Sequence, residues 1–180
     1  FNPLAVAVEE VVEVEFSPEA AVPPCAVVRD PRGFASPVQW IDSPDGGRRA
    51  LFLAKLAPLS LTVYSLEAVQ GTHPAGDLTA TGRGLANRHW SLHFDDAGDL
   101  VSLRRPGDPR ERLGSPFRFE LLRDVSERFP AWEVQHRDLA EPAAERFAGP
   151  CRFEVLEAGP VRVALAIERR SGRSTLTTRV

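Results

Sequence analysis

The sequence predicts an all-β chain, with a small β-sandwich followed by part of a larger sheet assembly. Three observations predict this class. Apolar and polar residues alternate with a period of two along several segments, turn-forming residues separate those segments, and no long, capped segment has a helical period. Such alternation is typical of antiparallel sheets that bury one face.

The expected strands follow in chain order. In the first, Val12, Val14 and Phe16 share one face, opposite Glu13 and Glu15. Further apolar or alternating rows are found at 51–56, 61–66, 90–94, 100–103, 117–121 and 161–167. The best helical candidate is 139–147, in which a proline at position 142 is compatible only with the first turn.

Segments of turn-forming residues separate these rows. Residues 30–33, 43–47 and 95–99 combine aspartate or proline with glycine, and the last of these segments predicts a hairpin loop. Residues 68–84 are rich in glycine and threonine and poor in large apolar side chains. We therefore predict a small sandwich over 1–68, a linker over 69–84 and the start of a second, larger β domain over 85–180.

Composition narrows the function classes. The chain has 180 residues, 43% of them hydrophobic and 26% charged, with a net charge of −3. This balance lacks the basic field that nucleic-acid binding needs, and no stretch approaches the roughly 20 apolar residues of a membrane span. Cys25 and Cys151 are the only cysteines. Two free thiols are favoured over a disulfide, which predicts a reducing, cytoplasmic location.

Two features indicate a piece of a longer protein. The sequence contains no methionine, and residues 174–180 alternate like a strand up to Val180. We therefore expect both domains to be truncated, with an unpaired sheet edge near Val180 or a homodimer that covers it.

Two groups of residues suggest metal binding, but each has a simpler explanation. His89 and His93 are four residues apart, yet Trp90, Leu92 and Phe94 indicate a strand, on which the two imidazoles would be roughly 13 Å apart. We expect both on the outer face. The carboxylates of 95–99 could hold a calcium ion, but aspartates are common in turns for local reasons.

The sequence shows no active site of its own. It contains no nucleophile motif and no phosphate loop, and its acidic residues cannot be paired across a pocket from sequence alone. We therefore predict no catalytic, cofactor-binding or metal residue. Trp40 and Trp132 are weak candidates for sugar contacts, because pyranose rings stack on indole faces. The alternative, favoured for tryptophans in sandwiches, is that they anchor the core.

Six ordered segments resemble the β region of family 38 α-mannosidases. In the first half, the resemblance lies in the opening Phe1–Leu4 (an "NPL" pattern), in Asp30 to Gly33 followed by Pro37-Val38-Gln39, and in 51–66. In the second half, it lies in 85–103, in Asp124 with 131–134, and in Glu157 to Thr175, which includes Gly159-Pro160-Val161-Arg162. One departure is Ala86, which stands where the family pattern has glutamate.

The resemblance implies a function that depends on residues outside this chain. Family members carry a catalytic α/β domain with zinc and an aspartate nucleophile, then a helical bundle, then β domains. This chain would cover the end of a small sandwich and the start of a supersandwich related to galactose mutarotase. It would support its own catalytic domain and the mannose pocket. It would carry no cofactor, whereas the full-length retaining enzyme would use zinc on α-mannosides.

Two other functions stay open. A free-standing carbohydrate-binding sandwich would bind sugar with an affinity of about −4 kcal/mol or stronger and would expose Trp40 or Trp132. A mutarotase-like epimerase would need a histidine and a glutamate that converge in a cleft.

Overall fold

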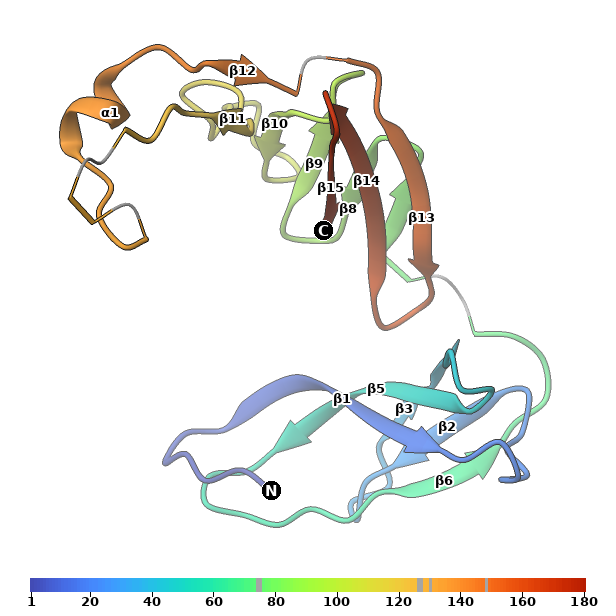
Figure 1. Cartoon of the computed structure of the whole chain (residues 1–180). Helices are drawn as coiled ribbons and strands as arrows, with labels where there is room; N and C mark the ends of the chain where they lie inside the picture. The colour runs from blue at the N-terminus through green and yellow to red at the C-terminus, as the bar shows by residue number, and fades with distance from the viewer. Residues whose placement is uncertain (74–75, 126–127, 130, 148) are drawn as a thin grey trace. The chain divides into compact units, whose positions relative to one another are not determined.

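The computed structural model describes residues 1–73, 76–125, 128–129, 131–147 and 149–180 (Figure 1). These residues form short antiparallel sheets and one short helix, which confirms the predicted all-β class. The chain divides into two compact units. The first comprises Phe1–Thr79 with Glu157–Val163, and the second comprises Ala80–Leu156 with Ala164–Val180.

Within residues 1–73 and 76–79, the first unit has two three-stranded antiparallel sheets. One has the order β1-β5-β4, formed by Val8–Phe16, Arg48–Leu56 and Gln39–Asp42. The other has the order β3-β2-β6, formed by Ala35–Pro37, Ala26–Arg29 and Ser65–Ala68. The long β1–β5 ladder pairs Val8 with Leu56 and Phe16 with Arg48, so it runs the full length of both strands.

The core of the first unit lies where these sheets meet. Seven buried apolar residues form it: Ala26, Val28, Val38, Ala50, Phe52, Ala54 and Leu56. Val8, Val12 and Phe16 of β1 pack against this cluster. The face that the alternation indicated is therefore partly buried, although Val14 of the same row stays 40% exposed.

The described residues of the second unit form three sheets. The order β10-β9-β8-β7 joins Leu100–Arg104, Ser91–Phe94, Gly84–Ala86 and Thr79–Thr81, the last of which begins at the final residue of the first unit. The order β13-β14-β15 joins Arg152–Ala158, Val163–Ser171 and Ser174–Arg179. β11 (Glu120–Leu121) pairs with β12 (Glu145–Arg146). Among the described residues, β15 is an edge strand.

The predicted helix at 139–147 is wrong in position. The helix α1 spans His136–Ala140, and β12 falls inside the predicted range. Glu141 has an extended backbone, with φ −72° and ψ 150°. It precedes Pro142, and the proline ring disfavours helical geometry in the residue before it. The helix therefore covers only the first two residues of the predicted range and ends at Ala140.

Two predicted strands form only in part. In the row 61–66, only the end belongs to a strand, because β6 begins at Ser65, and Leu61 and Val63 are exposed. In the row 117–121, only β11 and an isolated bridge between Phe117 and Leu100 are present. Neither row is hydrogen-bonded to a neighbouring strand along its whole length. Alternation alone therefore overestimated the extent of these two strands.

Strand β7 and the first residue of β8 lie inside the segment 69–84 that was expected to be a linker. In the described part of the chain, no helix is long and apolar enough to cross a membrane.

Candidate functional site

Trp40, one of the two predicted sugar contacts, is half-buried in β4. Its ring meets Phe16 edge-on at a centroid distance of 5.6 Å, and the Arg48 guanidinium lies 4.8 Å from the ring centroid. The indole Nε1 is buried without a hydrogen-bond partner among the residues described. A ring with these neighbours offers little surface to a pyranose, which favours the core-anchor alternative.

Trp132, the other candidate, has the opposite surroundings. It lies in a turn before α1 and is 83% exposed. Several apolar side chains of the same region are also exposed, including Val125, Phe129 and Val134. The structure therefore leaves Trp132, a residue of the second unit, accessible as a stacking surface.

The predicted histidine pair lies partly outside the expected strand. His93 is exposed in β9, as expected, but β9 begins at Ser91, so His89 lies in the preceding turn. Asn87 organises this turn, because its Oδ1 accepts the backbone N–H groups of His89 and Trp90, both at 2.8 Å. No three metal-ligand side chains of the described residues converge on a point that could hold an ion.

The carboxylates of the acidic loop between β9 and β10 already have hydrogen-bond or ion-pair partners. Asp95 Oδ1 accepts the N–H groups of Ala97 and Asp99 at 3.0 and 2.9 Å, which closes the hairpin loop. Asp96 pairs with Arg83, and Asp99 lies 3.7 Å from Arg118. Burial, and then the neighbouring charge of Asp95, raise the pKa of Asp99. These contacts favour the local turn explanation over a calcium site.

Arg169 contributes a further positive charge at the same loop. Its side chain is buried, donates to the carbonyl oxygens of Ala97 and Gly98, and lies 5.2 Å from the Phe119 ring centroid. A fixed guanidinium on the loop carbonyls opposes a bound cation, because like charges repel strongly where water is excluded.

The two cysteines are free thiols in half-buried positions. Cys25 Sγ lies 3.4 Å from Nε2 of His73, which itself lies 2.6 Å from the carbonyl oxygen of Ala26. Cys151 donates to the carbonyl oxygen of Asp96 at 3.2 Å, and burial raises its pKa. A raised pKa disfavours the thiolate that a cysteine nucleophile would need.

The residues of the quoted motifs mostly hold turns and strand ends. Asn2 is buried, and its Nδ2 donates to the carbonyl oxygens of Val6 and Ala57 at 2.9 and 2.8 Å. Asp30 Oδ1 accepts the N–H groups of Arg32 and Phe34, both at 2.9 Å. Burial of Asp30 acts to raise its pKa, but these hydrogen bonds together outweigh that effect and lower it.

One polar cluster joins two motif segments far apart in the sequence. Gln39 Oε1, from the segment 37–39, accepts the backbone N–H groups of Val161 and Arg162 at 3.1 and 2.8 Å. Gly159 lies beside it, and a Cβ at that position would lie 2.2 Å from the Gln39 side chain, so a larger residue would force that side chain to move. The motifs indicated both segments, 37–39 and Glu157 to Thr175, but the sequence did not predict that they are in contact.

Arg162 completes this cluster by binding two carboxylates. It donates to both oxygens of Glu157, at 2.6 and 3.0 Å, and to Glu13 at 2.5 Å. The hydrogen bonds to Glu157, offset in part by burial, raise the pKa of Arg162. The Glu157 side chain is only 3% exposed and is already engaged, so this acid pair does not present two accessible carboxylates to a glycosidic bond.

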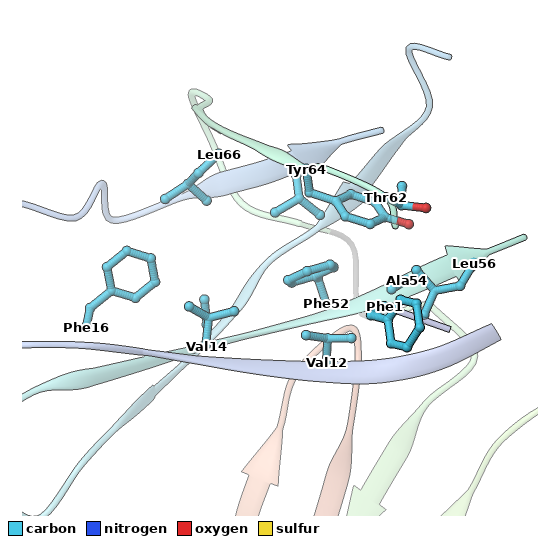
Figure 2. Close-up of a pocket in the computed structure, with 12 residues that line it drawn as sticks. Phe1, Val12, Val14, Phe16, Phe52, Ala54, Leu56, Thr62, Tyr64 and Leu66 are labelled. Atoms are coloured by element: carbon cyan, nitrogen blue, oxygen red, sulfur yellow. The ribbon is translucent and has the colours of Figure 1, made fainter. Parts of the chain in front are cut away.

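An apolar opening of about 310 Å³ lies between the two sheets of the first unit (Figure 2). Val12 and Val14 of β1 line one side, Tyr64 and Leu66 line the other, and Phe52 lies between them, 5.1 Å from the Tyr64 ring. Of the described residues that line it, only Tyr64 has a titratable side chain, and its hydroxyl hydrogen-bonds the backbone N–H and carbonyl of Lys55. These lining residues therefore provide no acid–base pair.

Taken together, these contacts define an all-β chain whose motif side chains stabilise turns and join segments. The family model described as Glycosyl hydrolases family 38 C-terminal domain matches residues 85–180, more than half of the chain. The chain therefore belongs to glycosyl hydrolase family 38, which confirms the resemblance read from its motifs. A comparison with curated proteins gave no match.

Proposed function

We propose that this chain is the non-catalytic β region of a retaining α-mannosidase, which supports the catalytic domain and the mannose pocket. The observation that carries the proposal is the match of residues 85–180 to the C-terminal domain of family 38. Zinc and the nucleophile would then belong to the catalytic domain of the complete enzyme, and α-mannosides would be its substrates.

The surroundings of the motif side chains support this role. Asn2, Asp30 and Gln39 are buried and hydrogen-bonded to backbone groups, and Arg162 binds two carboxylates of its own chain. Such side chains fix loop geometry, and a rigid supporting region holds a pocket built elsewhere in its productive shape.

The proposal is tested in the complete enzyme, by comparing the effect of a substitution on thermal stability with its effect on catalysis. Gln39→Ala removes an acceptor of two backbone N–H groups, so we expect earlier thermal inactivation. Well below the inactivation temperature, kcat/KM for an aryl α-mannoside should stay within about twofold of the parent. The purified chain alone should not hydrolyse that substrate with or without added Zn²⁺. Turnover by the chain alone, or a large loss of kcat in folded Gln39→Ala, would contradict the proposal.

The exposure of Trp132 favours a second candidate, a carbohydrate-binding module. Titration of the chain with mannose and mannobiose, followed by tryptophan fluorescence, tests it. A module would show saturable binding in the millimolar range or tighter, lost in Trp132→Ala and kept in Trp40→Phe. The absence of any saturable change in the parent chain would exclude this candidate.

A further inference from the structure

A small cleft with a basic lining lies in the second unit. It has a volume of about 280 Å³ and is lined by Arg88, His89, Trp90, Arg105 and Pro106. None of these five residues is acidic. The cleft is distinct from the motif contacts described above, because Arg88 and Arg105 take part in none of them.

Strand register brings Arg105 to Trp90, and the turn before β9 adds Arg88 to the same cleft. β9 and β10 are antiparallel and pair Ser91 with Arg104, so Trp90 and Arg105 are the next residues at that end of the ladder. The Arg105 guanidinium lies 5.0 Å from the Trp90 ring centroid. Arg88 precedes Trp90 by two residues, in the turn that leads into β9.

Both turns that form the cleft are fixed by hydrogen bonds. In the first, the Asn87 N–H donates to the Trp90 carbonyl at 2.8 Å, in addition to the two bonds accepted by the Asn87 side chain. In the second, the Asp108 N–H donates to the Arg105 carbonyl at 3.0 Å. Pro106 and Gly107, with φ +81° at the glycine, suit the central positions of a type II turn. The backbone that carries the lining side chains is therefore held in place before any ligand arrives.

The two cleft arginines keep donors available. Nε of Arg88 donates to His89 Nε2 at 3.0 Å, and its terminal amino groups have no protein partner among the described residues. Within the described part of the chain, the Arg105 guanidinium has no side-chain hydrogen bond and no carboxylate at ion-pair distance, and its charge acts on Asp108 at longer range. Guanidinium groups present fixed forks of N–H donors that match the oxygens of phosphate.

The carboxylates next to Arg105 in the sequence are engaged mainly by other arginines. Hydrogen bonds from Arg110 lower the pKa of Asp108 most, and the charges of Arg112 and then Arg105 lower it further. Asp108 binds Arg110 and Arg112, at 3.1 and 2.5 Å. Glu111 accepts the N–H of Leu103 at 2.7 Å and binds Arg104 at 3.1 Å. Hydrogen bonds from Leu103 and then Ser102 are the main causes that lower the pKa of Glu111 from 4.5 to about 2, so it stays ionised in this loop.

The local charge is positive in a chain that is negative overall. Residues 104–112 contain four arginines and two acidic residues, and Arg88 adds a further positive charge. The whole chain has a net charge of −3. Unpaired guanidiniums in a cleft raise the local concentration of anions.

We propose that this cleft is an oxyanion site and that its ligand is a phosphate monoester. A phosphate monoester carries about −1.5 to −2 charges at pH 7, enough to balance both Arg88 and Arg105, whereas a carboxylate balances only one of them. The inference rests on the arginines, the tryptophan and the strand register, and it holds whether or not the proposed role of the chain is correct.

Calorimetric titration of the purified chain at constant ionic strength tests the proposal. The probes are inorganic phosphate, mannose 6-phosphate, mannose and glucuronate. We expect saturable binding of both phosphates, weaker binding of glucuronate and none of mannose. Arg88→Gln and Arg105→Gln should each weaken phosphate binding about tenfold, because each removes a charged donor.

Arg170→Gln is the matched control. Arg170 is an exposed arginine of the same unit that pairs with Glu168 at 3.1 Å and does not line the cleft. This variant should bind phosphate like the parent, and circular dichroism should show all three variants folded. The absence of saturable phosphate binding, equal losses in all three variants, or tighter binding of glucuronate than of phosphate would overturn the proposal.

Discussion

Asn2, Asp30, Gln39 and Glu157 are polar residues of types that are mostly exposed in proteins, yet each is less than 10% exposed in this chain. Burial of a polar group costs free energy unless its hydrogen bonds are replaced. Asn2, Asp30 and Gln39 replace them with backbone partners, and Glu157 does so with the Arg162 guanidinium. The hydrogen bonds of these side chains therefore stabilise the fold.

Arg162→Ala should strongly destabilise the first unit. The substitution removes the guanidinium that donates two hydrogen bonds to Glu157, a carboxylate 3% exposed. Removal of one partner from a buried ion pair costs about 3 kcal/mol of unfolding free energy. Urea unfolding followed by circular dichroism measures the change.

A double-mutant cycle controls this experiment. Glu157→Gln removes the buried charge, so Arg162→Ala should cost much less in that background. Arg170→Ala breaks a pair in which the arginine is 76% exposed and should cost less than about 1 kcal/mol. Equal costs for Arg162→Ala in both backgrounds would show that the buried ion pair does not control stability.

At the scale of single elements, the β9–β10 hairpin loop shows how a glycine can serve two purposes. Gly98 has φ +81°, which only glycine adopts at little cost. A Cβ at this position would also lie 2.8 Å from both Arg169 Nη2 and Ile167 Cγ2. Gly107 has the same φ of +81°, but a Cβ there would meet nothing within 4 Å.

The two glycines form a matched pair for a test. Gly107→Ala should lower the unfolding free energy by about 1 kcal/mol, the cost of a left-handed conformation at an L residue. Gly98→Ala should cost clearly more, since it adds a collision with a buried arginine. Thermal and urea unfolding of both variants give the comparison. Equal losses would mean that Arg169 shifts without cost and that the loop packs loosely.

Elements with long, regular alternation were predicted well from sequence. The rows at 51–56 and 161–167 correspond to β5 and β14, whose buried residues include Leu51, Leu165 and Ile167. The row at 61–66 was overestimated, since β6 begins only at Ser65 and the Tyr64 side chain binds the backbone of Lys55 through its hydroxyl. Local alternation cannot show whether a neighbouring strand supplies a ladder.

At the scale of the whole molecule, sequence reasoning found the parts but not their contacts. The segments around Gln39 and Arg162 were both recognised from motifs, but 123 residues separate them, and their hydrogen bond is visible only in the structure. The basic cleft was missed for a related reason. The β9–β10 register is what brings Arg105 beside Trp90, and the sequence predicts a hairpin without fixing its pairs.

The division into two compact units predicts that unfolding is not a single transition. Each unit has its own buried apolar residues, with Val28 in the first and Ile167 in the second, so each can lose its packing separately. Differential scanning calorimetry should resolve two transitions. Val28→Ala, which removes two buried carbon atoms at a cost of about 2 kcal/mol, should lower one of them. Gly98→Ala should lower the other. A single transition, shifted alike by both substitutions, would show that the chain unfolds as one cooperative body.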